Sequence, residues 1–191
     1  MRLQPSEKYS DLEIKNTLFD QNLNFIDIQN SIFSSSGFNS LELNESYWND
    51  CKFFDMKFTE ASIRSSSIFN LSFLNMSFSE CDLRDSIFIE VNGESLKLKE
   101  SDLKGARFSD SKIQLLEMKS SKLDRVLFSN CDLSGSKFIN CNLYCAIFRG
   151  CNLTNATFEN SDLMLTRFQV CNLSNTVLPP SNKAIFENCF D

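Results

Sequence analysis

The sequence predicts an all-β solenoid, in which the chain winds into coils that stack on one another. Three observations predict it: an apolar residue at every fifth position, a small residue two positions before most of these, and similar segments that begin at residues 60, 80 and 100. Stacked coils are the geometry in which all such positions can point into one shared core.

The five-residue series runs from Leu18 to Leu178, and 32 of its 33 positions hold Leu, Ile, Phe, Met or Trp. With 42% apolar residues, chance would place about 14 there. A helix turns by about 500° in five residues, so the apolar positions would drift round its surface. A flat strand fails too, because an odd spacing alternates faces, and each repeat must therefore turn a corner. Gly93 is the exception, and we expect a local distortion of the coil at 91–95 because one core layer lacks a side chain.

The recurrence of similar segments predicts four five-residue repeats per coil. EASIR at 60–64, ECDLR at 80–84 and ESDLK at 100–104 would then lie directly above one another. The small position holds mainly Ser, Ala, Cys and Thr. Six of the eight cysteines occupy it, namely Cys51, Cys81, Cys131, Cys141, Cys151 and Cys171. We expect them to pack as small hydrophobic residues rather than to bind metal or form disulfides.

Five segments carry a family resemblance: CDLSG, CNLYC, CNLTN, SDLML and CNLSN, which begin at residues 131, 141, 151, 161 and 171. They resemble the A(D/N)LXX motif of the pentapeptide repeat family, and the resemblance covers about 85% of the chain. It implies a right-handed quadrilateral β-helix of about eight coils, roughly 40 Å long at a strand spacing near 4.8 Å.

The two ends depart from the repeat. We expect an N-terminal cap at 1–17, the β-helix at 18–178 and a capping or dimerisation tail at 179–191. Two prolines stop the pattern, and Ser181 or Asn182 would cap a short C-terminal helix. Its apolar face would comprise Ile185, Phe186, Cys189 and Phe190. This face either covers its own last coil or joins two copies into a homodimer.

The composition excludes several classes of function. The net charge of −6 argues against direct binding of nucleic acid or a membrane, since both need a basic face. The chain has no histidine, which removes the commonest general base, Ser-His and Cys-His pairs, and imidazole zinc sites. We therefore expect no catalytic residue, no cofactor, no metal and no enzyme activity. Without an apolar stretch of spanning or signal-peptide length, a cytoplasmic protein is expected.

Acidic columns are the first candidate for a partner-binding surface. With four repeats per coil, one column comprises Glu60, Glu80 and Glu100, and a second on the opposite side comprises Asp50, Glu90 and Asp110. Like charges stacked on neighbouring strands are destabilising. The columns therefore indicate either that nearby basic side chains compensate the negative charge or that the charge serves to bind a partner. Arg64, Arg84 and Lys104 form a column on the next face and are available to compensate.

An apolar column is the second candidate. It comprises Tyr47, Ser67, Ile87, Arg107, Leu127, Ile147 and Arg167, at the outward position before each inward residue. Tyr47, Ile87, Leu127 and Ile147 make it mostly apolar, and an exposed apolar strip with arginine is typical of interfaces. The plain alternative is a set of single surface hydrophobic residues, which are common.

The resemblance also implies a function. Some pentapeptide repeat proteins resemble duplex DNA in width, shape and negative charge, bind DNA gyrase or topoisomerase IV, and give bacteria tolerance to quinolones or natural gyrase toxins. This chain departs from them by having no loop between repeats and an acidic excess concentrated in positions 1–60, which hold ten acidic and five basic side chains. The alternative is a scaffold or interaction module that binds an unrelated protein through the apolar column.

Overall fold

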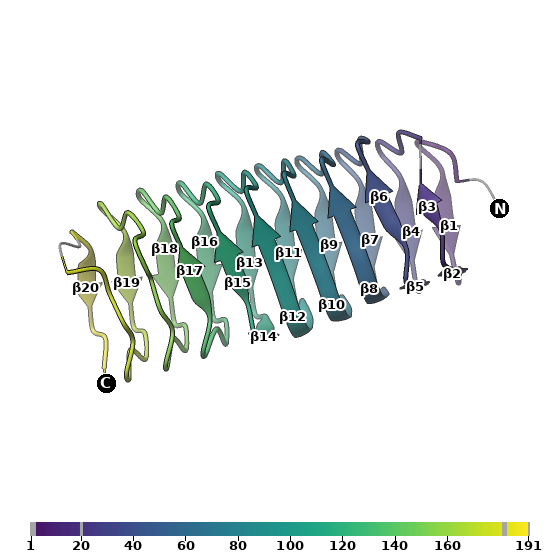
Figure 1. The fold of residues 1–191 in the computed structure, drawn as a ribbon. Coiled ribbons are helices and arrows are strands. Elements are labelled where there is room, and N and C mark those ends of the chain that lie inside the picture. Colours follow the sequence, from purple (N-terminus) through teal and green to yellow (C-terminus); the bar gives the residue numbers. More distant parts are fainter. Residues whose placement is uncertain (1–2, 20, 181–182, 191) are drawn as a thin grey trace.

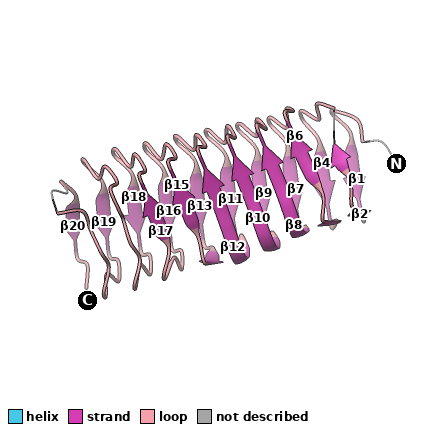
Figure 2. Cartoon of the chain, viewed as in Figure 1, coloured by secondary structure: helices cyan, strands magenta, loops and turns pink. Residues whose placement is uncertain are grey.

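The fold is a parallel β-solenoid of about nine turns, as seen in a computed structural model that describes residues 3–19, 21–180 and 183–190. Figure 1 shows the turns stacked along one axis, with the two chain ends at opposite ends of the stack. Figure 2 shows strands joined by short loops, and the described residues contain no helix. The predicted all-β solenoid is confirmed.

Ten three-residue strands stack into the first sheet, which is parallel throughout. In order they are β1 (Lys8–Ser10), β4 (Asp27–Gln29), β7 (Tyr47–Asn49), β9 (Ser67–Phe69), β11 (Ile87–Ile89), β13 (Arg107–Ser109), β16 (Leu127–Ser129), β18 (Ile147–Arg149), β19 (Arg167–Gln169) and β20 (Ile185–Glu187). In the centre of the sheet Phe108 lies opposite Phe128, and the neighbouring strands keep the same register. Four five-residue repeats therefore make one coil, as predicted.

Ten further strands form the second sheet. They are β17 (Lys137–Ile139), β15 (Glu117–Lys119), β14 (Lys112–Gln114), β12 (Asn92–Lys99), β10 (Ser72–Ser79), β8 (Lys52–Thr59), β6 (Gly37–Asn39), β5 (Ile32–Ser34), β3 (Leu18–Phe19) and β2 (Glu13–Lys15). Three of them, β8, β10 and β12, have eight residues and continue round a corner of the coil. The remaining side is joined by isolated parallel bridges, such as Ser62 with Asp82.

A residue in the left-handed backbone region turns each corner. It lies two positions after the inward apolar residue, and its φ is between 45° and 63° at the corners that hold a residue other than glycine. Asn, Asp and Ser occupy many of these corners and Gly occupies three. Asn and Asp tolerate this conformation because their short polar side chains bond locally, and glycine tolerates it because it has no Cβ. The polar residues between the apolar ones therefore help to specify the fold, because many of them allow the backbone to turn at a corner.

Val170 is a corner residue that breaks this rule. It is β-branched, has a φ of 55° and is 54% exposed. We expect Val170→Asn to raise the free energy of unfolding by about 1 kcal/mol, because it relieves backbone strain and removes little packing. Equilibrium urea denaturation measures the change. The reverse substitution at a comparable exposed corner, Asn155→Val, should lower stability by a similar amount, and no gain in Val170→Asn would contradict the strain.

Phenylalanine rings fill the core as stacked columns. The longest comprises Phe88, Phe108, Phe128, Phe148, Phe168 and Phe186, with centroid distances of 4.5–5.3 Å and ring planes within 17°. Phe138 and Phe158 form a second column and meet the first edge-on. From Leu23 to Phe168 every fifth residue except Gly93 is buried. The predicted inward series is confirmed over this range.

The first coil has a different register from the one predicted. Leu18 is 68% exposed, whereas Phe19 is buried and its ring stacks on Phe38 at 4.5 Å. Phe19 lies opposite Phe38, so this coil is shorter by one position than the regular coils. The prediction that the inward series begins at Leu18 is wrong. Both residues are large and apolar, and strand pairing with the next coil selects the second of them.

The described part of residues 1–17 belongs to the same stack. Strands β1 and β2 pair with β4 and β5, which places Tyr9 opposite Ile28 and Ile14 opposite Phe33. Tyr9 and Ile14 pack against the core. This segment therefore ends the solenoid as a coil of its own, and the number of turns is about nine rather than about eight.

At Gly93 the strand pairing is unbroken, since it lies opposite both Phe73 and Ile113. The pairing thus gives no sign of the predicted distortion, and the structure instead leaves no room for a side chain at this position. A Cβ on Gly93 would lie 2.1 Å from the carbonyl oxygen of Phe73 and 2.8 Å from its ring. The neighbouring coil thus occupies the space that an inward side chain would need.

The predicted C-terminal helix is wrong. Residues Ile185–Glu187 form β20, which pairs with β19 in a register shorter than the regular period and places Phe186 on Phe168. A short isolated helix is marginal in water, whereas the edge of β19 offers unpaired backbone groups. Ser181 and Asn182, the predicted helix caps, lie outside the described residues.

Candidate functional site

The column of Glu60, Glu80 and Glu100 lies along one corner of the solenoid. All three residues are exposed and have the left-handed corner conformation, on three successive coils. Glu60 accepts a hydrogen bond from the Ser40 hydroxyl at 3.0 Å, and Glu100 pairs with Lys99 at 3.2 Å. Within the described residues the Glu80 carboxylate has no such partner. The structure therefore brings the predicted column together.

The arginines on the next face do not neutralise this column. Arg84 donates two hydrogen bonds to Asp82, at 2.8 and 2.5 Å, and Arg64 lies 3.8 Å from the same carboxylate. Partial burial raises the pKa of Asp82, but the hydrogen bonds and charge of Arg84, with Arg64, outweigh it and hold the pKa below its ordinary value. The expected compensation thus goes to Asp82, because its oxygens lie on the same face as both guanidinium groups.

The opposite acidic column is broken up by asparagine. Asn70 donates a hydrogen bond to Asp50, and Asn130 donates one to Asp110 at 3.1 Å. In this column only Glu90 and Asp110 are acidic neighbours on successive coils. It therefore carries less concentrated charge than the column of Glu60, Glu80 and Glu100.

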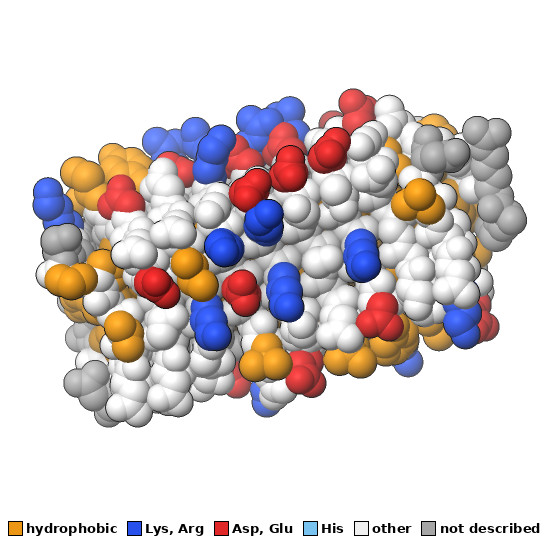
Figure 3. Space-filling view, in the orientation of Figure 1, with side chains coloured by type: hydrophobic (Ala, Val, Ile, Leu, Met, Phe, Trp, Pro, Cys, Tyr) orange, Lys and Arg blue, Asp and Glu red, His pale blue; other side chains and the backbone are white. Residues whose placement is uncertain are grey.

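A basic face was missed by the sequence reasoning. It lies on the second sheet and comprises Lys57, Lys97, Lys99, Lys119 and Lys137. Lys99 lies opposite Lys119 on adjacent strands. Figure 3 shows basic side chains over the second sheet, with single acidic side chains among them, and a row of acidic side chains following its edge. The signal was present in the sequence, since Lys57, Lys97 and Lys137 recur on every second turn.

The predicted apolar column is one continuous row of the first sheet. Its members pair strand by strand from Tyr47 on β7 to Arg167 on β19. Tyr47 is exposed, and Ile87, Leu127 and Ile147 are half-buried. Two residues that the prediction omitted enlarge the patch on the neighbouring row: Phe69, whose ring lies 5.5 Å from that of Tyr47, and Ile89.

The C-terminal end is a third apolar surface. Ile185, Phe186 and Phe190, which were predicted to cap the rod or contact a second copy, are 36%, 44% and 55% exposed. They lie on the last turn, where the ring of Phe186 stacks on the ring of Phe168 in the coil before it. The structure therefore brings these three residues to the same end of the stack, on a strand and its extension rather than on a helix.

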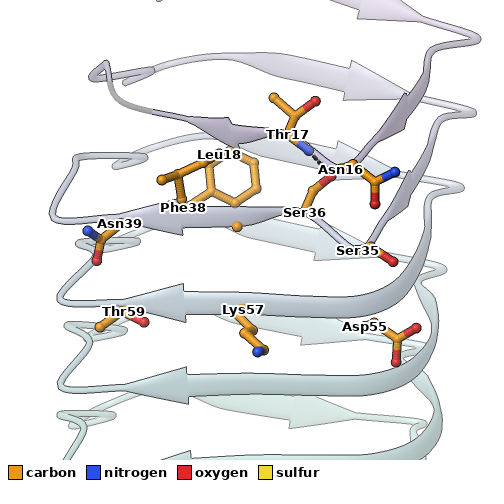
Figure 4. Close-up of a pocket in the computed structure, with 11 residues that line it drawn as sticks. Asn16, Thr17, Leu18, Ser35, Ser36, Phe38, Asn39, Asp55, Lys57 and Thr59 are labelled. Carbon is orange, nitrogen blue, oxygen red and sulfur yellow. Dashed lines mark hydrogen bonds between the residues drawn. The ribbon is translucent and has the colours of Figure 1, made fainter.

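The outer surface also has a shallow groove of about 500 Å³ near the N-terminal end, lined by both polar and apolar side chains. Figure 4 shows its lining, in which the Thr17 amide donates to the Ser36 hydroxyl at 3.1 Å and Leu18 lies beside Phe38. Across the described residues, no three cysteine or acidic side chains are placed to hold a metal ion. In that same part of the chain, no helix has the length and apolar character to cross a membrane.

Comparisons with known proteins identify the repeat. A family model described as a pentapeptide repeat region matches residues 42–118 and 64–138, and a model of eight pentapeptide repeats matches 121–160 and 141–178. Curated protein sequences give no significant match.

Two solved structures illustrate the shared fold. QnrB1 in a trypsin-treated form, a plasmid-mediated fluoroquinolone resistance protein, is 18% identical with a TM-score of 0.55, covering 95% of this chain and 93% of QnrB1. HetL, involved in heterocyst differentiation regulation in the cyanobacterium Nostoc, is 16% identical with a TM-score of 0.56, covering 97% of this chain and 87% of HetL. Since the family models match well over half of the sequence, the chain belongs to the pentapeptide repeat family.

Proposed function

We propose that this protein is a non-enzymatic, cytoplasmic binding protein that protects a type II topoisomerase, DNA gyrase or topoisomerase IV, and so gives tolerance to quinolones or gyrase toxins. The observation that carries the proposal is the column of Glu60, Glu80 and Glu100, whose charges the neighbouring arginines leave largely unneutralised. Its charges recur at about 4.8 Å, the strand spacing, comparable with about one per 3.4 Å along a DNA strand. The shared fold with QnrB1 supports it.

The basic face restricts how such a partner binds. Lysines on the second sheet lie directly beside the column of Glu60, Glu80 and Glu100, so the surface imitates one phosphate strand rather than a whole duplex. A DNA-binding groove lined by basic residues would accept the acidic corner and repel the lysine face. We therefore place the contact at this corner and expect it to weaken as salt rises.

A gyrase supercoiling assay with and without a quinolone tests the proposal. Wild-type protein at micromolar concentration is expected to restore supercoiling in the presence of the quinolone, or to inhibit supercoiling in its absence. The triple variant Glu60→Gln, Glu80→Gln, Glu100→Gln is expected to lose the effect. The matched control, Asp50→Asn, Glu90→Gln, Asp110→Asn, removes the same charge from the opposite corner and should retain it. Equal loss in both variants would indicate a general charge effect, and an inactive wild type would refute the proposal.

A second candidate is a scaffold or interaction module that binds an unrelated protein. The apolar patch of Tyr47, Phe69, Ile87 and Ile89 on the first sheet favours it. If supercoiling is unaffected, capture of a partner from a bacterial lysate should be insensitive to the triple Glu→Gln change. It should instead be lost on Ile87→Lys, because the new charge would have to be desolvated in the interface.

We also propose a homodimer through the C-terminal end. Exposed Ile185, Phe186 and Phe190 would be covered by the same surface of a second copy. Sedimentation equilibrium should give twice the chain mass for the wild type and the chain mass for Phe190→Ser. A monomeric wild type would refute the dimer and leave these residues as a cover for their own coil.

A further inference from the structure

Four cysteines stack in one column at the C-terminal end of the solenoid. They are Cys131, Cys151, Cys171 and Cys189, and each thiol contacts the carbonyl oxygen of a phenylalanine, at 3.2–3.5 Å. Cys189 lies outside the five-residue series that places the other three at equivalent positions. The pairing of Asn172 with Phe190 brings it into the column.

The last pair of this column differs from the others in exposure. Cys131, Cys151 and Cys171 are buried, whereas Cys189 is partly exposed on the final turn. Cys171 lies between Cys151 and Cys189 in the column, since Asn172 pairs with both Asn152 and Phe190. The neighbouring Cys151 thiol lowers the pKa of Cys171 against the opposing effect of burial, and Cys189 adds to the lowering. A buried thiol therefore lies beside a partly exposed one.

We propose that Cys171 and Cys189 form a reversible disulfide that fastens the terminal strand to the last full coil when the protein meets a peroxide. The Cys189 thiolate attacks one oxygen of hydrogen peroxide, which breaks the O–O bond, releases hydroxide and leaves a sulfenic acid. The Cys171 thiolate then attacks this sulfur, so that the S–S bond forms and the S–O bond breaks. Two thiols lose two hydrogen atoms in total, and the peroxide becomes two molecules of water.

Geometry favours this pair over the others in the column. A disulfide needs Cβ atoms about 3.8 Å apart, whereas neighbouring strands are spaced at about 4.8 Å. Closing the bond therefore requires one strand to move by about 1 Å. Cys131 and Cys151 each have a full coil on both sides, whereas Cys171 is followed only by the terminal turn, and the segment of Cys189 is held from one side only. The end of the stack is where the movement meets least resistance.

The bond would change how the terminal turn opens. That turn is held by backbone hydrogen bonds, including Ile185 N to Thr166 O and Val170 N to Glu187 O at 2.8 Å each, and by the ring of Phe186. Reduced protein can open this turn locally, because terminal elements have few neighbours. A covalent link across 172–188 restricts the open state, so oxidised protein keeps Phe168 covered.

The test treats the reduced full-length protein with a small excess of hydrogen peroxide. Mass spectrometry should show loss of two hydrogen atoms, and peptide mapping should find Cys171 joined to Cys189. Hydrogen exchange at the amides of Ile185 and Val170 should slow at least about tenfold. Dithiothreitol should restore the original mass and exchange rates.

Matched variants decide the outcome. Cys189→Ser and Cys171→Ser should abolish the cross-link, and both are expected to fold because a buried serine, Ser111, occupies the same position in an earlier coil. Cys145→Ser, at a partly exposed corner outside the column, should behave as the wild type. The proposal is overturned if Cys151 joins Cys171 instead, if Cys189 becomes sulfinic acid without a cross-link, or if the link forms only between two chains.

Discussion

Phe148→Ala is expected to lower the free energy of unfolding by about 3–5 kcal/mol. Phe148 is fully buried and has four ring neighbours: it stacks on Phe128 and Phe168 at 5.0 and 5.1 Å, and meets Phe138 and Phe158 edge-on at 5.7 Å. Truncation leaves a cavity that the neighbouring coils cannot close, since hydrogen bonds hold them at the strand spacing. Because each coil contacts only its neighbours, the loss weakens both interfaces of this coil.

Equilibrium urea denaturation measures the effect, and a second phenylalanine of the same column provides the control. Phe186 stacks on one ring only and is 44% exposed, so Phe186→Ala should cost no more than about 1.5 kcal/mol. Similar losses in the two variants would contradict the view that stability comes from continuous stacking in the interior.

Gly93→Leu is expected to lower the free energy of unfolding by about 1–3 kcal/mol or more, although it completes the five-residue apolar pattern. A Cβ at this position would lie 2.1 Å from the carbonyl oxygen of Phe73, which is backbone of the neighbouring strand. Relief would require the strand to shift and weaken its pairing with β10 and β14. The sequence pattern predicts that this substitution raises the free energy of unfolding, whereas the space available at Gly93 predicts that it lowers it.

The control separates the backbone clash from the ring contact. In Phe73→Leu, Gly93→Ala the 2.8 Å contact with the ring is removed, but the 2.1 Å contact with the carbonyl remains. We expect this double variant to be less stable than Phe73→Leu alone. A gain in stability for Gly93→Leu, measured by urea or thermal denaturation, would show that the core has an unfilled layer here.

Much of the interior could be predicted because the repeat is local and identical from coil to coil. Phe138 and Leu143 are buried as their five-residue spacing requires. The row from Tyr47 to Arg167 also follows from the coil period alone. The lysines of the basic face follow from the same period, which places Lys97 and Lys137 in one row with Glu117 between them.

The ion pairs required side-chain geometry. The coil period places Arg64 and Arg84 on the face next to the three glutamates, but their guanidinium groups lie beside Asp82. The period places Cα atoms in columns and leaves open which carboxylate a long side chain reaches. The pairing of both arginines with Asp82 leaves the glutamate column available to a partner.

By itself the sequence determined the period, the corner chemistry and the inward residues from Leu23 to Phe168, because each coil repeats one local solution. Only the tertiary structure decided the two ends, where Phe19 replaces Leu18 in the core and β20 replaces a helix. It also brought Cys189 beneath Cys171. The physical reason is that a terminal coil has a partner on one side only, so its register is set by the backbone hydrogen bonds and rings that the neighbouring coil presents.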